Sequence, residues 1–217
     1  MYKEKFIEQC LYYEGVREGT PVHGQIVKIY NSIKPLPQKY TLKTSDAWCA
    51  SYLSAMAWKC SGGDPSAFPY ECSCQRMIQK AKDQKIWIED ESVKPKAGWL
   101  ILYDWHDSGS GDNKGTADHV GLIYKVTSKT IYVIEGNNAD SVKKRQIPIN
   151  GKYIRGFIAL RYTAATRPKS AIVDNVARQV IRGQWGTGEK RRQLLESAGY
   201  DPATVQKRVN ELLSSTK

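Results

Sequence analysis

The spacing of apolar residues changes twice along this 217-residue chain. Up to about residue 85 the apolar side chains recur at helical intervals, and from Ala97 β-branched and aromatic residues lie between turn formers. The expected helices are Tyr2–Val16, Ile26–Ile33, Ala47–Lys59 and Glu71–Lys85. The expected strands are Trp99–Tyr103, Val120–Val126, Thr130–Ile134 and Gly156–Tyr162. Helices followed by antiparallel strands predict an α+β domain over residues 1–162.

Helical spacing returns near the end of the chain, after a short predicted linker over residues 163–170. Residues 171–217 hold enough apolar positions for three short helices, which predict a small three-helix bundle. Asp174 and Asp201 are expected N-caps, and Pro202 suits a first helical position. A bundle of this length is close to the lower size limit for independent folding.

The charge of the chain is strongly positive, at +11. A basic surface favours a polyanion, which leaves nucleic acid, an anionic membrane and a cell wall that carries teichoic acid as open alternatives. No stretch approaches the length of about eighteen apolar residues that suggests a membrane span. The N-terminal sequence MYKEKFIEQC lacks the apolar region of a secretory signal, so we expect synthesis in the cytoplasm.

The cysteine pattern favours free thiols. An odd count of five cysteines argues against a complete disulfide framework. Cys72 and Cys74 have a single residue between them, which differs from the two-residue spacing of structural zinc sites. We therefore expect no metal at this pair and neutral, mostly buried thiols.

One cysteine has a context that suggests chemistry. Residues Thr44-Ser45-Asp46 offer N-cap side chains ahead of Ala47–Lys59, so Cys49 is expected in the first turn of a capped helix. The positive end of the helix dipole stabilises a thiolate, which is the nucleophilic form of cysteine. A cysteine in a helix is more often a small core residue, so a second observation is needed.

A predicted hairpin supplies that observation. Pairing of residues 120–126 with 130–134 places the start of the first strand beside the end of the second. His119 then comes close to Glu135 or Asn137, either of which could orient the imidazole of a cysteine–histidine pair. The Gly-, Asp- and Ser-rich residues 105–118 are expected to form a loop beside this site.

Residues 44–162 resemble the CHAP domain, a cysteine- and histidine-dependent amidohydrolase or peptidase with a papain-like fold. The matching segments are AWCASYLSAMA, KAGWLILYDW, DHVGLIYKV, IYVIEGN and IRGFIALRY. The resemblance implies Cys49 as nucleophile, His119 as general base and then acid, Glu135 as its orienting group and Asn137 as a fourth polar member. It implies no cofactor. Some CHAP domains carry an acidic calcium loop before the cysteine, but residues 38–46 contain one acid, so we predict no calcium.

The end of the chain resembles a CW-type cell-wall-binding repeat of phage lysins, through the segment GQWGTGEKRRQLLESAGYD. The resemblance implies binding of the disaccharide–peptide unit of peptidoglycan. Arg191 is the favoured contact, because a guanidinium suits carboxylates and sugar hydroxyls. Trp185 is either core or a sugar platform, and Tyr200 is a further candidate that also suits a core cap. A single repeat implies weak binding unless the protein oligomerises.

Together these features predict an endolysin-type peptidoglycan hydrolase, with N-acetylmuramoyl-L-alanine amidase as the first choice of activity. A stem-peptide or cross-bridge endopeptidase with the same residues is the alternative. The expected partners are peptidoglycan and anionic wall polymers, reached after cell lysis or through a holin. A wall-binding protein without catalysis and a nucleic-acid-binding protein are the other classes. Acids interleave with the basic residues of the tail and no recognition-helix motif is present, which argues against nucleic acid.

Overall fold

The chain forms two compact units, Met1–Ala164 and Ala165–Lys217, and each has its own apolar core. The computed structural model describes residues 1–107, 114–163, 169–198 and 200–214. Parts of the predicted loop 105–118 and the predicted linker 163–170 therefore lie outside the described residues, as does Gly199 of the tail motif. None of the described helices has the length and apolar content to cross a membrane.

Helices make up the first part of the first unit, as the sequence predicted. They are α1 (Lys3–Tyr12), α2 (Pro21–Asn31), the 3-10 turn η1 (Pro37–Lys39), α3 (Cys49–Ser61) and α4 (Cys74–Asp83). The start of α3 differs from the prediction. The helix begins at Cys49, and its N-cap is Trp48, which makes no side-chain capping bond. The Asp46 carboxylate instead accepts the Lys43 N–H at 2.7 Å, so it stabilises the preceding turn.

A six-stranded antiparallel sheet follows, with the order β1-β6-β2-β3-β4-β5. Its strands are β1 (Trp87–Ile88), β2 (Leu100–Tyr103), β3 (His119–Val126), β4 (Thr130–Glu135), β5 (Lys143–Pro148) and β6 (Ile154–Ile158). The predicted α+β fold class is confirmed. The two strands that the sequence did not predict are the edge strands: β1 has two residues, and β5 is rich in charge and partly exposed.

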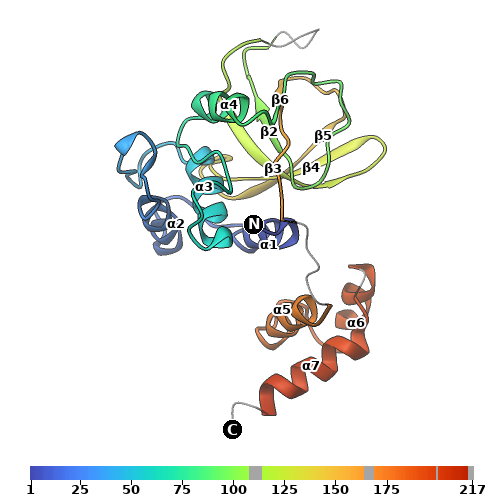
Figure 1. The fold of residues 1–217 in the computed structure, drawn as a ribbon. Coiled ribbons are helices and arrows are strands. Elements are labelled where there is room, and N and C mark those ends of the chain that lie inside the picture. The colour runs from blue at the N-terminus through green and yellow to red at the C-terminus, as the bar shows by residue number, and fades with distance from the viewer. Residues whose placement is uncertain (108–113, 164–168, 199, 215–217) are drawn as a thin grey trace. The chain divides into compact units, whose positions relative to one another are not determined.

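The two faces of the sheet carry separate apolar clusters. Alternate residues such as Leu100, Val120 and Leu122 pack with the helices, which gather on one side of the sheet (Figure 1). The residues between them, including Ile101 and Ile123, form a cluster on the other face. Because nearly every residue of α3 is buried, this helix is held against the sheet and its first residue has a fixed position.

The second unit contains α5 (Lys169–Ile181), α6 (Gly188–Ser197) and α7 (Pro202–Ser214). Valines and Leu195 form its core. Asp201 caps α7 as expected, since its carboxylate accepts the Thr204 N–H at 3.1 Å. The predicted N-cap role of Asp174 is wrong, because α5 begins at Lys169. Asp174 lies inside α5 and accepts a hydrogen bond from Arg208 Nε of α7 at 2.7 Å.

Candidate active site

The sheet register brings His119 and Glu135 together. His119 is the first residue of β3, and Leu122 pairs with Ile134, so the start of β3 lies beside the end of β4. His119 Nε2 is 3.2 Å from Glu135 Oε2, and both side chains are buried. With Nε2 directed at the carboxylate, Nδ1 is the ring nitrogen left for a second partner. Cys49 is close enough to be that partner, since Cys49 and His119 shift each other's pKa.

The Glu135 carboxylate is fully buried and receives three donors. Besides His119, Arg145 Nε lies 2.8 and 2.9 Å from its two oxygens, and Asn138 Nδ2 donates at 2.8 Å. Burial alone would raise the pKa of Glu135, but the hydrogen bond from His119 and the charges of His119 and Arg145 outweigh it and lower the pKa. Glu135 therefore stays ionised at neutral pH and fixes the imidazole.

The charges of the site favour an ion pair between Cys49 and His119. A hydrogen bond from Cys74 lowers the pKa of Cys49; burial opposes this, and His119 and the Ala50 N–H lower the pKa further. Burial alone would lower the pKa of His119, but its contacts with Cys49 and Glu135 raise it to about 9. A thiolate beside an imidazolium is the reactive form of a cysteine nucleophile.

Aromatic rings pack beside the imidazole. Trp105 stacks on Tyr103 with ring centres 4.8 Å apart, and its centre is 5.9 Å from that of His119. The Arg145 guanidinium lies 5.2 Å from the Trp105 ring centre. Because 40% of Trp105 remains exposed, one side of the site is a partly open aromatic surface. Substrate could contact this surface next to the imidazole.

Asn137 is not the residue whose amide contacts Glu135. It is half-buried and adopts a left-handed backbone conformation, with φ of 56°. The amide that reaches Glu135 belongs to Asn138, which the sequence did not single out. The role of Asn137 as a fourth polar member stays a prediction.

Gly121 leaves the space that Glu135 occupies. A Cβ atom at Gly121 would lie 2.8 Å from Glu135 Cγ and 2.3 Å from Val133 Cγ1. Either contact is shorter than packed carbon atoms tolerate. The glycine of the HVG segment is therefore a steric requirement of the His119–Glu135 pair.

Three side chains near the site resemble a cation cluster. Asp104, His106 and Asp118 have ligand atoms within 4.8 Å of one another. The two carboxylates already accept backbone N–H groups, from His106 at 2.9 Å and from Trp105 at 2.8 Å. These bonds explain the arrangement as a turn, so it carries no argument for a metal.

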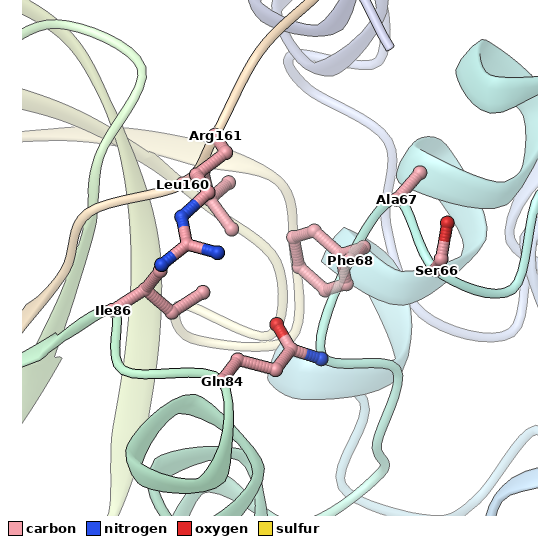
Figure 2. Close-up of a pocket in the computed structure, with 7 residues that line it drawn as sticks. All are labelled: Ser66, Ala67, Phe68, Gln84, Ile86, Leu160 and Arg161. Carbon is pink, nitrogen blue, oxygen red and sulfur yellow. The ribbon is translucent and has the colours of Figure 1, made fainter.

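A pocket of about 260 Å³ opens elsewhere on the first unit (Figure 2). Its walls come from the segments after α3, α4 and β6. The lining residues are Ser66, Ala67, Phe68, Gln84, Ile86, Leu160 and Arg161. None of the predicted catalytic residues lines it, so it is separate from the candidate active site.

The three predicted wall-binding residues lie in different surroundings in the second unit. Trp185 and Tyr200 pack edge to face at 5.8 Å beside the core, and Trp185 Nε1 donates to Gln179. Arg191 lines a pocket of about 320 Å³ with Arg192. Its Nε donates to the Gly186 carbonyl at 2.9 Å, which fixes the guanidinium at the pocket wall.

Replacing Glu135 with glutamine is expected to lower the pKa of His119 from about 9 toward its ordinary value of about 6.5. The amide can accept a hydrogen bond but supplies no negative charge for the imidazolium. An NMR titration of the His119 ring measures the change, and Glu4→Gln, which removes an exposed carboxylate of α1, is the control. An unchanged His119 pKa in Glu135→Gln would contradict the proposed electrostatic coupling.

Two family models match separate parts of the chain. The CHAP domain model matches residues 40–137, which include Cys49, His119 and Glu135, and the CW_7 repeat model matches residues 174–213. A protein named lysozyme, from Streptococcus phage Cp-7, is 54% identical to this chain over 37 residues in the repeat region. The match covers 17% of this chain and 11% of the phage protein. No solved structure matches the chain. The chain therefore contains a CHAP domain and, after it, a CW_7 repeat.

Proposed function

We propose that this chain is a peptidoglycan hydrolase that cleaves an amide bond of the bacterial cell wall. The observation that carries the proposal is the buried chain of contacts from Cys49 through His119 to Glu135 inside the CHAP match. The CW_7 match supports the wall as the place of action. A protein with this role acts outside the cytoplasm, and release by cell lysis or a holin is part of the proposal.

The proposed reaction proceeds through an acyl-enzyme. The Cys49 thiolate attacks the carbonyl carbon, and backbone N–H groups at the start of α3 stabilise the oxyanion. His119, as imidazolium, gives its proton to the leaving amine, and the carbon–nitrogen bond breaks. Neutral His119 then takes a proton from water, whose attack on the thioester frees Cys49. Glu135 keeps the imidazole oriented and stabilises its charged form throughout.

The proposed bond is the amide between N-acetylmuramic acid and L-alanine, and a stem-peptide or cross-bridge bond is the alternative. The pattern of the segments AWCASYLSAM, DHVGLI and IEGN resembles that of amidases, which supports the first. Mass spectrometry of fragments from purified walls separates the two: an amidase frees the amino group of L-alanine, and an endopeptidase creates new ends within the peptides. Zymography with Cys49→Ser as the blank tests for hydrolysis. If the wild type releases no product, the chain is a wall-binding protein without catalysis.

The proposed wall contact is the Arg191 pocket. Arg191 brings a positive charge to a pocket whose apolar wall includes Leu195, whereas the charge of Arg192 beside it is paired with Glu189 and Glu196. Because Arg191 is already held by the Gly186 carbonyl, its side chain loses little conformational entropy when it binds a carboxylate of the peptide stem. The Trp185–Tyr200 pair is the proposed apolar surface for a sugar ring.

Removal of residues 168–217 is expected to separate catalysis from wall binding. The first unit has its own core and all proposed catalytic residues, so cleavage of a soluble muropeptide should stay within about twofold. Lysis of intact cells should fall about tenfold or more, because the repeat raises the local concentration of enzyme on an insoluble substrate. Turbidity of cell suspensions and chromatography of the muropeptide measure the two rates.

A point variant refines this test. Arg191→Ala in the full chain should weaken pull-down by walls, whereas the exposed Arg182→Ala outside the pocket serves as the charge-matched control. Equal weakening by both variants would indicate plain electrostatic attraction, which salt screens. Loss of soluble muropeptide cleavage on truncation would show that the second unit is part of the catalyst.

A further inference from the structure

A second thiol lies against the proposed nucleophile. Cys74 Sγ is 3.6 Å from Cys49 Sγ, and both cysteines are buried. Cys49 is the first residue of α3 and Cys74 is the first residue of α4. The positive ends of two helix dipoles therefore meet at the two sulfur atoms, which favours one negative charge between them.

The start of α4 is held in this position by two side chains. Ser73 caps the helix, since its hydroxyl accepts the Arg76 N–H at 3.4 Å. Gln75 Oε1 accepts the Ala117 N–H at 3.1 Å, which joins the first turn of α4 to the residues just before His119. Cys74 thus belongs to a tethered segment beside the imidazole, and its sulfur has little freedom to move away.

We propose that Cys74 is a further residue of the catalytic site: its S–H group donates a hydrogen bond to the Cys49 thiolate and stabilises the nucleophile. The proposal rests on the proposed function, in which Cys49 is that nucleophile. It assigns Cys74 a chemical part that packing does not require, because any small apolar residue could fill the space of a buried thiol.

The charges around the two sulfurs favour Cys74 as the donor. The hydrogen bond with Cys49 raises the pKa of Cys74; burial, the charge of Cys49 and the Asp118 carboxylate raise it further. The pKa of Cys49 is lowered, by Cys74 first and also by His119. At neutral pH Cys74 is therefore the thiol and Cys49 the thiolate. A thiol has one proton to donate, and the anionic sulfur 3.6 Å away is a strong acceptor.

The hydrogen bond also affects how the reaction ends. When Cys49 becomes a thioester it loses its negative charge, and the bond from Cys74 weakens. When water attacks the thioester, Cys49 leaves as a thiolate and the bond strengthens again. Cys74 therefore assists the release of the acyl group as well as the formation of the thiolate.

The test compares two substitutions that differ in one hydrogen-bond donor. Cys74→Ser keeps a donor, Cys74→Ala removes it, and Cys60→Ala removes a buried thiol from the far end of α3 as the control. Alkylation of Cys49 by iodoacetamide is followed by peptide mass spectrometry from pH 4 to 9, with a phosphine reductant present. This measurement needs no substrate, so it does not depend on hydrolase activity.

The midpoint of Cys49 alkylation should rise by about one pH unit in Cys74→Ala, which slows alkylation about tenfold on the acid side. Cys74→Ser should lie closer to the wild type, and Cys60→Ala should coincide with it. A midpoint that Cys74→Ala leaves unchanged would overturn the proposal, as would equal midpoints for the serine and alanine variants. Failure of the proposed function is a separate result, namely no wall hydrolysis by the wild type, and wall hydrolysis by Cys49→Ser would exclude Cys49 as its nucleophile.

Discussion

Replacing Cys49 with serine is expected to lower wall hydrolysis by about 10⁴-fold or more and to leave the fold and wall binding intact. A serine hydroxyl is far less acidic than a thiol, so the surroundings that yield a thiolate yield no alkoxide. The loss should appear in the turbidity of cell suspensions and in muropeptide release. Circular dichroism, thermal melting and pull-down by walls should match the wild type, because the side chains differ by a single atom.

The matched control for this result is Cys72→Ser. Cys72 is a half-buried free thiol two residues before the start of α4, and its sulfur accepts a hydrogen bond from Gln38 Nε2 at 3.3 Å. Its replacement should leave hydrolysis close to the wild-type rate. Wild-type lysis by Cys49→Ser would show that another group attacks the amide. Cys74 would then be the first alternative, since it is the thiol in contact with Cys49.

The order of elements was predictable because it depends on local pattern. Apolar spacing distinguished the helices from the strands, and the short turn between β3 and β4 determined which strand ends meet. The hairpin argument therefore placed His119 near Glu135, and the structure joins them at 3.2 Å. The edge strand β5 was missed because its charged and partly exposed residues lack a buried strand pattern.

The missed strand explains one missed residue of the site. Arg145 pairs with Val133 in the sheet, and Glu135 pairs with Lys143, so Arg145 and Glu135 are diagonal neighbours on one face. Without β5 no sequence argument connects the guanidinium with the carboxylate. Asn138 was missed for a local reason: the backbone after β4 turns so that this amide, two residues beyond Gly136, reaches back to Glu135.

The role of Cys74 could not be predicted from the sequence, because it depends on tertiary packing. Its contact with Cys49 spans 25 residues and depends on how α4 packs beside the start of α3. The sequence also suggested that Cys49 alone lies at a capped helix start. The structure reverses this: Ser73 caps the helix of Cys74, and the helix of Cys49 has no side-chain cap. The Cys49 thiolate is stabilised instead by Cys74, His119 and the Ala50 N–H.

Replacing His119 with alanine is expected to be as damaging as the loss of Cys49, and the double variant should be little worse than either single one. In the proposed mechanism the two side chains act as one unit, because the imidazole both forms the thiolate and protonates the leaving amine. Rates on a soluble muropeptide for the two single variants and the double variant measure this. Exposed His106→Ala is the control, since 88% of that side chain is accessible.

The pH dependence of the wild type tests the same unit by another route. Contacts with Cys49 and Glu135 outweigh burial and raise the pKa of His119 to about 9, so the imidazolium persists through neutral pH and is lost as the pH rises past about 9. The proton for the leaving amine is lost with it, so kcat should fall above that pH. In Glu135→Gln the fall should begin at lower pH. If the fall of kcat at high pH is unchanged in Glu135→Gln, a group other than His119 supplies the proton. Independent and additive losses from Cys49→Ala and His119→Ala would mean the same.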